Sequence, residues 1–218
     1  MAPLKRALAL LLLLAACTPR PLPPEARFLG AEVLGLEAEG PALLLGLKVA
    51  FQNPNPFPLP LEALGVVARL GPLTLPLSAT LPQGESVQTI TLRLRPAEAL
   101  DTARRLLSRE GVPLRLEGRV LGQGYTFFQT TLALPLEPLR VRRVGVNLYV
   151  ENPNPLPLEA QGEVRFLGQR LAVRLSLPAK GEGRLVVAGF RPGLGGEREL
   201  WLRLTLPGFF SWDAVFPL

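Results

Sequence analysis

The side chains that most often carry out chemistry in proteins are scarce in this sequence of 218 residues. It contains no His, a single Cys at position 17, and only two Asp, at positions 101 and 213. Without His, the chain cannot form a Ser-His-Asp or Cys-His catalytic group or a zinc site of the Cys/His type. Acid–base chemistry would fall to Glu, Lys or Tyr, and no paired carboxylates stand in a motif. We therefore predict that the protein is not an enzyme and holds no metal and no cofactor.

The single thiol, Cys17, closes an apolar stretch at the N-terminus. Lys5 and Arg6 precede ten apolar residues, 7–16, a run too short to cross a bilayer, which takes about 20 residues. Such a pattern is typical of a secretory signal peptide. Its end, Leu14-Ala15-Ala16-Cys17, resembles the lipobox of bacterial lipoproteins. The resemblance implies that residues 1–16 are removed and that the Cys17 thiol carries a diacylglycerol. The alternative is an ordinary signal peptide whose apolar run ends at a Cys by chance.

A lipid anchor would place the chain in the cell envelope. Thr18, rather than Asp, follows Cys17, which by analogy with the sorting rule of enteric bacteria favours the outer membrane, with the protein facing the periplasm. Residues 17–27 would then be a spacer, because Pro-rich segments are extended and stiff. The membrane is the expected partner through the lipid, and nucleic acid is not expected as a partner of an exported chain.

Four of the five Asn in the chain occur in two copies of one phrase. The copies are Asn53-Pro54-Asn55-Pro56 and Asn152-Pro153-Asn154-Pro155. Pro cannot donate a backbone hydrogen bond, and an Asn side chain can bond the backbone two residues further on, so each phrase should end a strand in a turn. We interpret both phrases as structural turns. The alternative is that their amide side chains bind a ligand.

Alternating apolar residues lead into both phrases. They are Leu45, Leu47, Val49 and Phe51 in the first copy, and Val144, Val146, Leu148 and Val150 in the second. A period of two places one set of side chains on a buried face, so both runs should be strands. Short strands separated by Gly and Pro are typical of sandwiches. We predict a mainly β fold of two tandem antiparallel β-sandwiches, similar to fibronectin type III or immunoglobulin domains, at 28–137 and 138–218.

One helix is expected, in the first copy only. Pro96 suits the first position of a helix, and Gly111 suits a left-handed stop after its last turn. The apolar residues that should share one face and pack on a sheet are Leu100, Ala103, Leu106 and Leu107. In the second copy, a loop at 191–196 takes the place of this helix.

Each Asn-Pro-Asn phrase follows an alternating strand and precedes a Pro-Leu pair, Pro58-Leu59 in the first copy and Pro155-Leu156 in the second. This arrangement resembles the WHy domain (water stress and hypersensitive response), also called the type 2 late-embryogenesis-abundant domain. The resemblance implies an antiparallel sandwich with one helix and a non-enzymatic role in protecting envelope components, including client proteins, against desiccation or heat. Two alternatives are an envelope protein-interaction module and a lipoprotein that binds a lipid or another apolar ligand.

Two further clusters are candidate contact surfaces. The basic cluster consists of Arg140, Arg142 and Arg143. It could contact anionic headgroups or an acidic polymer of the envelope, or it could be a solvated strand face. The aromatic cluster consists of Trp201, Phe209, Phe210, Trp212 and Phe216. We expect it in the core and the closing strand, with an apolar patch for a lipid or partner as the alternative.

Overall fold

The alternating apolar runs form β-strands in the computed structural model, which describes residues 21–37, 39–120, 122–166, 168–186 and 198–218. Within these residues the fold is mainly β, with antiparallel sheets and a single α-helix. The prediction of antiparallel β-sandwiches is confirmed. The predicted signal peptide, Cys17 and the predicted loop at 191–196 lie outside the described residues.

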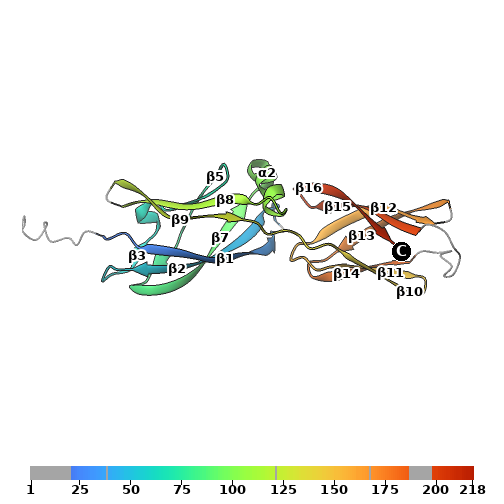
Figure 1. The fold of residues 1–218 in the computed structure, drawn as a ribbon, viewed down its shortest axis with the longest axis horizontal. Coiled ribbons are helices and arrows are strands. Elements are labelled where there is room, and N and C mark those ends of the chain that lie inside the picture. Colours follow the sequence, from blue (N-terminus) through green and yellow to red (C-terminus); the bar gives the residue numbers. More distant parts are fainter. Residues whose placement is uncertain (1–20, 38, 121, 167, 187–197) are drawn as a thin grey trace, which may run out of the picture.

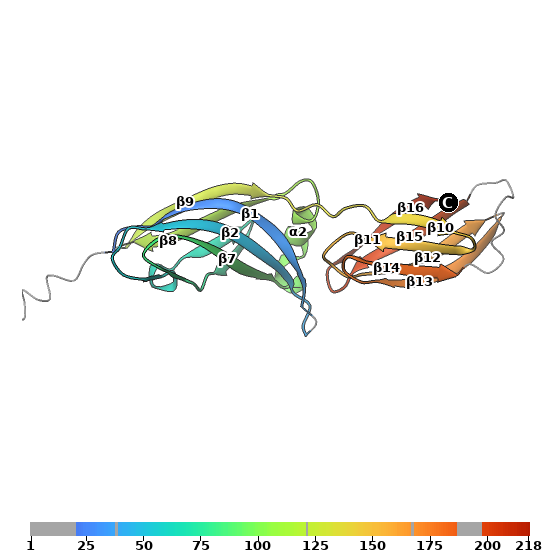
Figure 2. The same ribbon diagram turned by 90° about the horizontal axis from the view of Figure 1, so that it is seen from below.

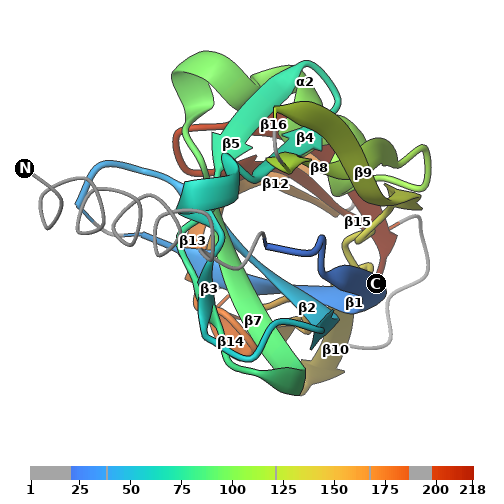
Figure 3. The ribbon, with the colours of Figure 1, turned by 90° about the vertical axis from the view of Figure 1, so that its left-hand side faces the viewer.

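The first half of the chain folds into two facing layers. Its elements are β1 (Glu25–Leu36), β2 (Leu43–Asn53), β3 (Leu59–Pro60), the 3-10 turn η1 (Glu62–Leu64), β4 (Val67–Leu70), β5 (Leu73–Pro76), β6 (Thr80–Leu81), β7 (Gly84–Leu94), α2 (Pro96–Leu106), β8 (Val112–Val120) and β9 (Gln123–Leu132). One layer has the strand order β1-β2-β7 and the other β5-β4-β8-β9, with a short β3–β6 ladder besides. Figure 3 shows these two layers facing one another, seen along the length of the molecule.

The second half repeats this arrangement. Its strands are β10 (Arg140–Val144), β11 (Asn147–Asn152), β12 (Leu158–Phe166), β13 (Gln169–Leu177), β14 (Gly181–Val186), β15 (Arg198–Leu206) and β16 (Phe210–Pro217). Their orders are β10-β11-β14 and β13-β12-β15-β16, so each strand has a counterpart in the first half. The internal repeat that the two Asn phrases indicate in the sequence is therefore also a repeat of sheet topology.

The two sandwiches follow one another along the long axis of the molecule (Figures 1 and 2). Helix α2 lies at the end of the first sandwich that faces the second. An extended segment between β9 and β10 connects them. The segment that leads into β1, drawn in blue in Figure 1, lies at the opposite end of the first sandwich.

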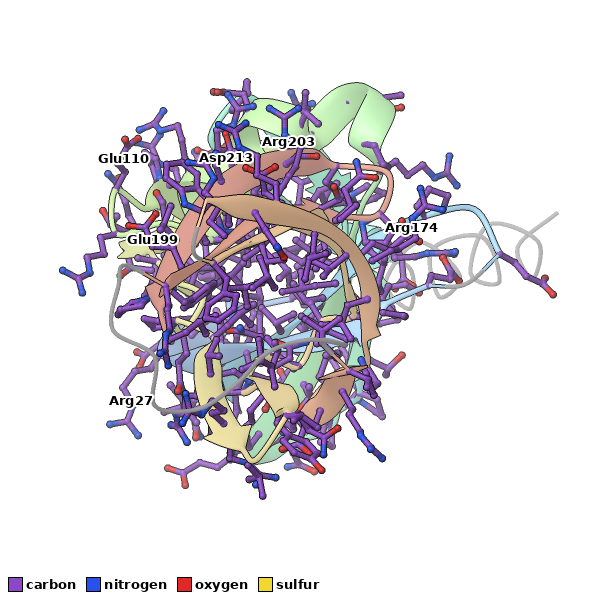
Figure 4. All side chains as sticks on the ribbon, turned by 90° about the vertical axis from the view of Figure 1, so that its right-hand side faces the viewer. Arg27, Glu110, Arg174, Glu199, Arg203 and Asp213 are labelled. Carbon is purple, nitrogen blue, oxygen red and sulfur yellow. The ribbon has the colours of Figure 1, made fainter. Side chains whose placement is uncertain are left out.

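The core forms where the alternation predicts it. In β2, Leu45, Leu47 and Val49 are fully buried, whereas Lys48 and Gln52 are exposed. In the second sandwich, the labelled side chains of Arg174, Arg203 and Asp213 lie at the outside, and side chains fill the space between the layers (Figure 4). Burial of these apolar side chains is the main source of stability in such a fold, at roughly 25 cal/mol per Å² of apolar surface removed from water.

Helix α2 begins at Pro96 as predicted, but it ends at Leu106, five residues before the predicted left-handed stop, and its buried face is shifted. Pro96 is its first residue, and Gly111 follows with a φ of +72° while its N–H donates to the Arg105 carbonyl oxygen (3.1 Å). The buried side chains of the helix are Ala99, Thr102, Ala103 and Leu106, and Leu107 just beyond it is also buried. Leu100, predicted on this face, is 42% exposed, because it lies at the margin of the stripe that those residues form.

The alternating run before the second Asn phrase is not one strand. Gly145 adopts a φ of +62°, and Val144 pairs with Asn147, so the chain reverses between β10 and β11. Leu148 and Val150 are buried as predicted. Val144 and Val146 were expected on the same buried face, but they lie at the hairpin end and are 52% and 48% exposed. A glycine in the left-handed region permits this reversal, which alternation alone does not reveal.

The first sandwich begins before its predicted boundary. Strand β1 starts at Glu25, which pairs with Gln52 of β2, so residues 25–27 of the predicted spacer belong to the sheet. Further towards the N-terminus, Leu22 is hydrogen-bonded to the sandwich. The described part of the Pro-rich segment is therefore attached to the folded domain.

Candidate functional site

Asn53, at the end of β2, connects two turns of the first sandwich. Its Nδ2 group donates to the carbonyl oxygens of Phe57 (3.0 Å), Pro82 (3.1 Å) and Leu81 (3.3 Å). Its Oδ1 atom accepts from the backbone N–H (3.1 Å) and from the Nδ2 group (2.8 Å) of Asn55. Asn53 is 1% exposed. A buried amide without hydrogen-bond partners would destabilise the fold, so these bonds matter for stability.

Asn55 holds the segment that leads into the first sandwich. Its Oδ1 atom accepts from the backbone N–H of Leu22 (2.8 Å), and its Nδ2 group donates to the carbonyl oxygen of the same residue (2.9 Å). One side-chain amide therefore pairs with a backbone residue as a neighbouring strand would. The Asn phrase thus fixes where the chain enters the domain.

The second copy repeats both sets of bonds. Asn152 donates to the carbonyl oxygens of Leu156 (2.7 Å) and Pro178 (3.0 Å), and its Oδ1 atom accepts from the backbone (3.1 Å) and side chain (3.1 Å) of Asn154. Asn154 in turn accepts from the N–H of Glu137 (2.7 Å) and donates to its carbonyl oxygen (2.9 Å). The segment held this time is the one that connects the two sandwiches.

These contacts favour the structural interpretation of the phrases over a ligand site. All four Asn are at most 4% exposed, and their amides bond within the chain. Pro54 and Pro153 lie between the two Asn of each phrase and have no N–H to satisfy. Sequence reasoning missed the role of the second Asn, because its partners lie 33 and 17 residues away and no local signal marks them.

The predicted basic cluster is largely neutralised by neighbouring carboxylates. Its members Arg140, Arg142 and Arg143 all belong to β10. Arg140 lies 3.6 Å from Glu137 and 3.4 Å from Glu151. Arg142 lies 2.7 Å from Glu182. The guanidinium groups of Arg140 and Arg142 are therefore already ion-paired, which weakens the case for a site for anionic headgroups or polymers.

The carboxylates with shifted pKa values also serve the fold. Burial acts to raise the pKa of Glu117, but hydrogen bonds from Arg115 and Arg69, with their charges, lower it overall. A hydrogen bond from Ser78 lowers the pKa of Glu62. Both groups are thus held in their ionised form, whereas a general acid needs a raised pKa. Over the described ranges, no group of three His, Cys, Asp or Glu side chains could hold a metal ion.

The aromatic cluster near the C-terminus divides between two faces. Phe209 is buried, and Phe210, Trp212 and Phe216 are half-buried on the inner face of β16. Trp201 lies on the outer face of β15, because Leu200 and Leu202 on either side of it are buried. There its Nε1–H donates to Glu199 (2.6 Å), and the Arg165 guanidinium stacks 4.0 Å from the ring centroid. The expectation that this Trp belongs to the core is wrong.

The inner face of β16 borders a cavity of about 380 Å³ between the sandwiches. We call it the junction cavity. Helix α2 and the residues after it form one side, the connecting segment forms another, and the second sandwich forms the floor. Its lining consists of Arg104, Leu107, Ser108, Leu136, Glu137, Pro138, Leu139, Asn154, Leu158, Leu204, Phe210, Trp212, Ala214 and Phe216. Most of these side chains are apolar, and the volume falls in the usual range for small-molecule sites, roughly 300–1,000 Å³.

Direct contacts fix the position of the junction. The N–H groups of Leu134 and Leu136 donate to the carbonyl oxygens of Leu106 (2.7 Å) and Leu107 (3.1 Å) at the end of α2. On the other side, Gly208 of the β15–β16 turn lies so close to Pro41 that an added Cβ would be 2.8 Å from its side chain. The cavity is therefore lined by both sandwiches and depends on the tandem arrangement.

Comparisons with known proteins leave the family of the chain open. No protein-family model matches it, and no curated protein matches it. Among the helices of the described residues, none is long and apolar enough to span a bilayer. Among solved structures, the chain is similar to the YadV chaperone, at 14% identity and a TM-score of 0.32, over 89% of this chain and 100% of that one. A TM-score at this level does not establish a common fold or a common function.

Proposed function

We propose that this chain is a non-enzymatic lipoprotein of the cell envelope that holds its second sandwich away from the membrane for contact with another envelope component. The observation that carries the proposal is the position of Leu22. Asn55, two residues beyond the end of β2, binds it there, and β2 ends on the side of the first sandwich that points away from the second (Figure 1). An anchor at Cys17, five residues earlier, would leave the second sandwich farthest from the bilayer.

Exposed apolar side chains at the far end of the second sandwich support this proposal. Val144, Val146 and Val186 are 52%, 48% and 66% exposed. They come together because Asn147 pairs with Val144 on one side and with Val186 on the other. Because these Val side chains are exposed, they contribute little to the hydrophobic core. Clusters of exposed apolar side chains are typical of contact surfaces.

The anchor is tested by labelling with a fatty acid. In cells of the native host, a labelled fatty acid should enter the wild-type chain and not the Cys17→Ala variant. The physical basis is that several acyl chains hold a protein on a bilayer, since each buried CH₂ contributes about 0.8 kcal/mol. Equal labelling of both chains would refute the anchor.

Stress protection is the second candidate, and the resemblance of both Asn phrases to the WHy domain supports it. A fragile, unrelated enzyme would be dried, or frozen and thawed, with the chain or with an equal mass of an inert protein. Activity retained well beyond the inert control would support a general protectant. Equal loss of activity with the chain and with the inert protein would contradict stress protection and favour contact with another envelope component.

A further inference from the structure

Among the described residues, the lining of the junction cavity combines an apolar interior with one cationic side chain, Arg104. Phe210, Trp212 and Phe216 line it from β16, and Leu158 and Leu204 line it from the neighbouring strands. Aromatic rings present large, rigid apolar surfaces to a ligand. An interior of this kind favours an alkyl or aromatic body.

The polar groups of the cavity are not equivalent. Asn154 is bonded to the backbone of Glu137, and the carboxylate of Glu137 lies 3.6 Å from Arg140. Ser108 donates to the Arg105 carbonyl oxygen (2.8 Å) and accepts from the N–H of Glu110 (3.2 Å). These three groups already have partners within the chain.

Arg104 differs from them. In the part of the chain that the structure describes, its guanidinium group forms no ion pair; it lies 5.8 Å from the centroid of the Phe210 ring. The side chain is exposed, so its charge stands where the cavity meets solvent. An anionic group placed there would gain a charge-assisted hydrogen bond without displacing an existing ion-pair partner.

We propose that the junction cavity binds a single-chain amphiphile with an anionic head, of which a medium-chain fatty acid is the simplest example. The carboxylate contacts Arg104 at the mouth, and the chain lies against the aromatic side chains of β16. The site is formed jointly by both sandwiches, and it does not depend on the anchor at Cys17.

The two Trp residues of the chain provide a selective test. Trp212 lines the cavity, whereas Trp201 lies on the outer face of β15. The protein would be used from residue 18 onward, which contains every described residue. Bromine quenches Trp fluorescence on contact, so ω-bromoundecanoic acid should quench the Trp201→Phe variant saturably, because that variant retains Trp212. The Trp212→Phe variant, which retains Trp201, should not be quenched. Equal or non-saturable quenching of both variants would overturn the proposal.

The anionic head is tested with a neutral analogue in the Trp201→Phe background. The acid should bind about tenfold more tightly than the corresponding bromo alcohol, and Arg104→Gln should remove that difference. Arg109→Gln, an exposed arginine of the same region that does not line the cavity, should retain it. Equal affinity for acid and alcohol without any substitution would contradict the role of Arg104.

The apolar interior is tested by filling it. Ala214 lies on the inner face of β16 among the lining residues. Ala214→Leu in the same background should abolish saturable quenching while the thermal unfolding midpoint stays the same or rises. Quenching that persists in a folded Ala214→Leu variant would show that the acid binds elsewhere.

Discussion

The second Asn of each phrase substitutes for a strand at the start of a domain. Asn55 pairs with both backbone groups of Leu22, and Asn154 does the same with Glu137. The first Asn, at 53 or 152, makes this possible because its Oδ1 atom accepts two bonds from the second. Four buried amides in two copies thus secure the incoming chain of each sandwich, and the repeat explains why Asn is concentrated there.

Asn152→Ala should destabilise the protein by about 2–3 kcal/mol, because it removes the donor to the carbonyl oxygen of the buried Leu156 and the acceptor for the backbone and side-chain N–H groups of the buried Asn154. Urea unfolding followed by fluorescence would measure this change. The matched control is Asn147→Ala, because Asn147 bonds only the exposed side chain of Arg184 and is the one Asn outside the phrases. The control should change stability by no more than about 0.5 kcal/mol. Similar losses in both variants would argue against a special structural role for the phrase.

At the scale of elements, the sequence predicted what is local and missed what depends on distant partners. The strand at 45–51 was predicted because one face of β2 is buried along its length. The helix was predicted from Pro96 and Gly111, which are local signals for the two ends of a helix. Leu100 was wrongly assigned to its buried face, because that face depends on where the sheets lie. The pairing of Asn55 with Leu22 spans 33 residues, and no local pattern encodes it. The junction cavity could not be predicted either, since it depends on how two sandwiches meet.

Strand β12 depends on the absence of a side chain at one position. Gly162 pairs with Leu202 of β15, and an added Cβ would lie 1.9 Å from the carbonyl oxygen of Trp201. Gly162→Ala should therefore separate the two strands and cost about 3 kcal/mol, at the upper end of ordinary overpacking. Gly124→Ala in β9 is the control, because no atom lies within 4 Å of its added Cβ. Denaturant unfolding of both variants checks this, and an unaffected Gly162→Ala variant would show that β12 and β15 can move apart freely.

At the scale of the whole molecule, the contact between the sandwiches determines what the protein can bind. Helix α2 occupies the end of the first sandwich, and the connecting segment is bonded to its last turn. The same segment is bonded to Asn154 of the second sandwich. One stretch of chain is therefore fixed at both ends, which positions the junction cavity and directs the far end of the second sandwich away from Leu22.

Gly208 tests whether this junction contributes to stability. It has a φ of +79°, and an added Cβ would lie 2.8 Å from the side chain of Pro41 across the junction. Gly122 has a φ of +81° in the corresponding β8–β9 turn and meets no atom within 4 Å. Gly122→Ala should lower the free energy of unfolding by about 1 kcal/mol, because Ala is disfavoured in the left-handed conformation. Gly208→Ala should lower it by about 1–3 kcal/mol more, because the added methyl group also clashes with Pro41. Equal losses in urea unfolding would mean that the sandwiches do not support one another at this contact.

The measurement that tests the central claim most directly is cross-linking in the intact envelope. A photoreactive residue would replace Val146 at the far end of the second sandwich or, as the matched control, Val87 on β7 of the first, which is 56% exposed. If the second sandwich is held out for contact, Val146 should yield one adduct of defined mass and Val87 should yield none. Equal adducts from both positions, or none from Val146, would contradict the proposed function.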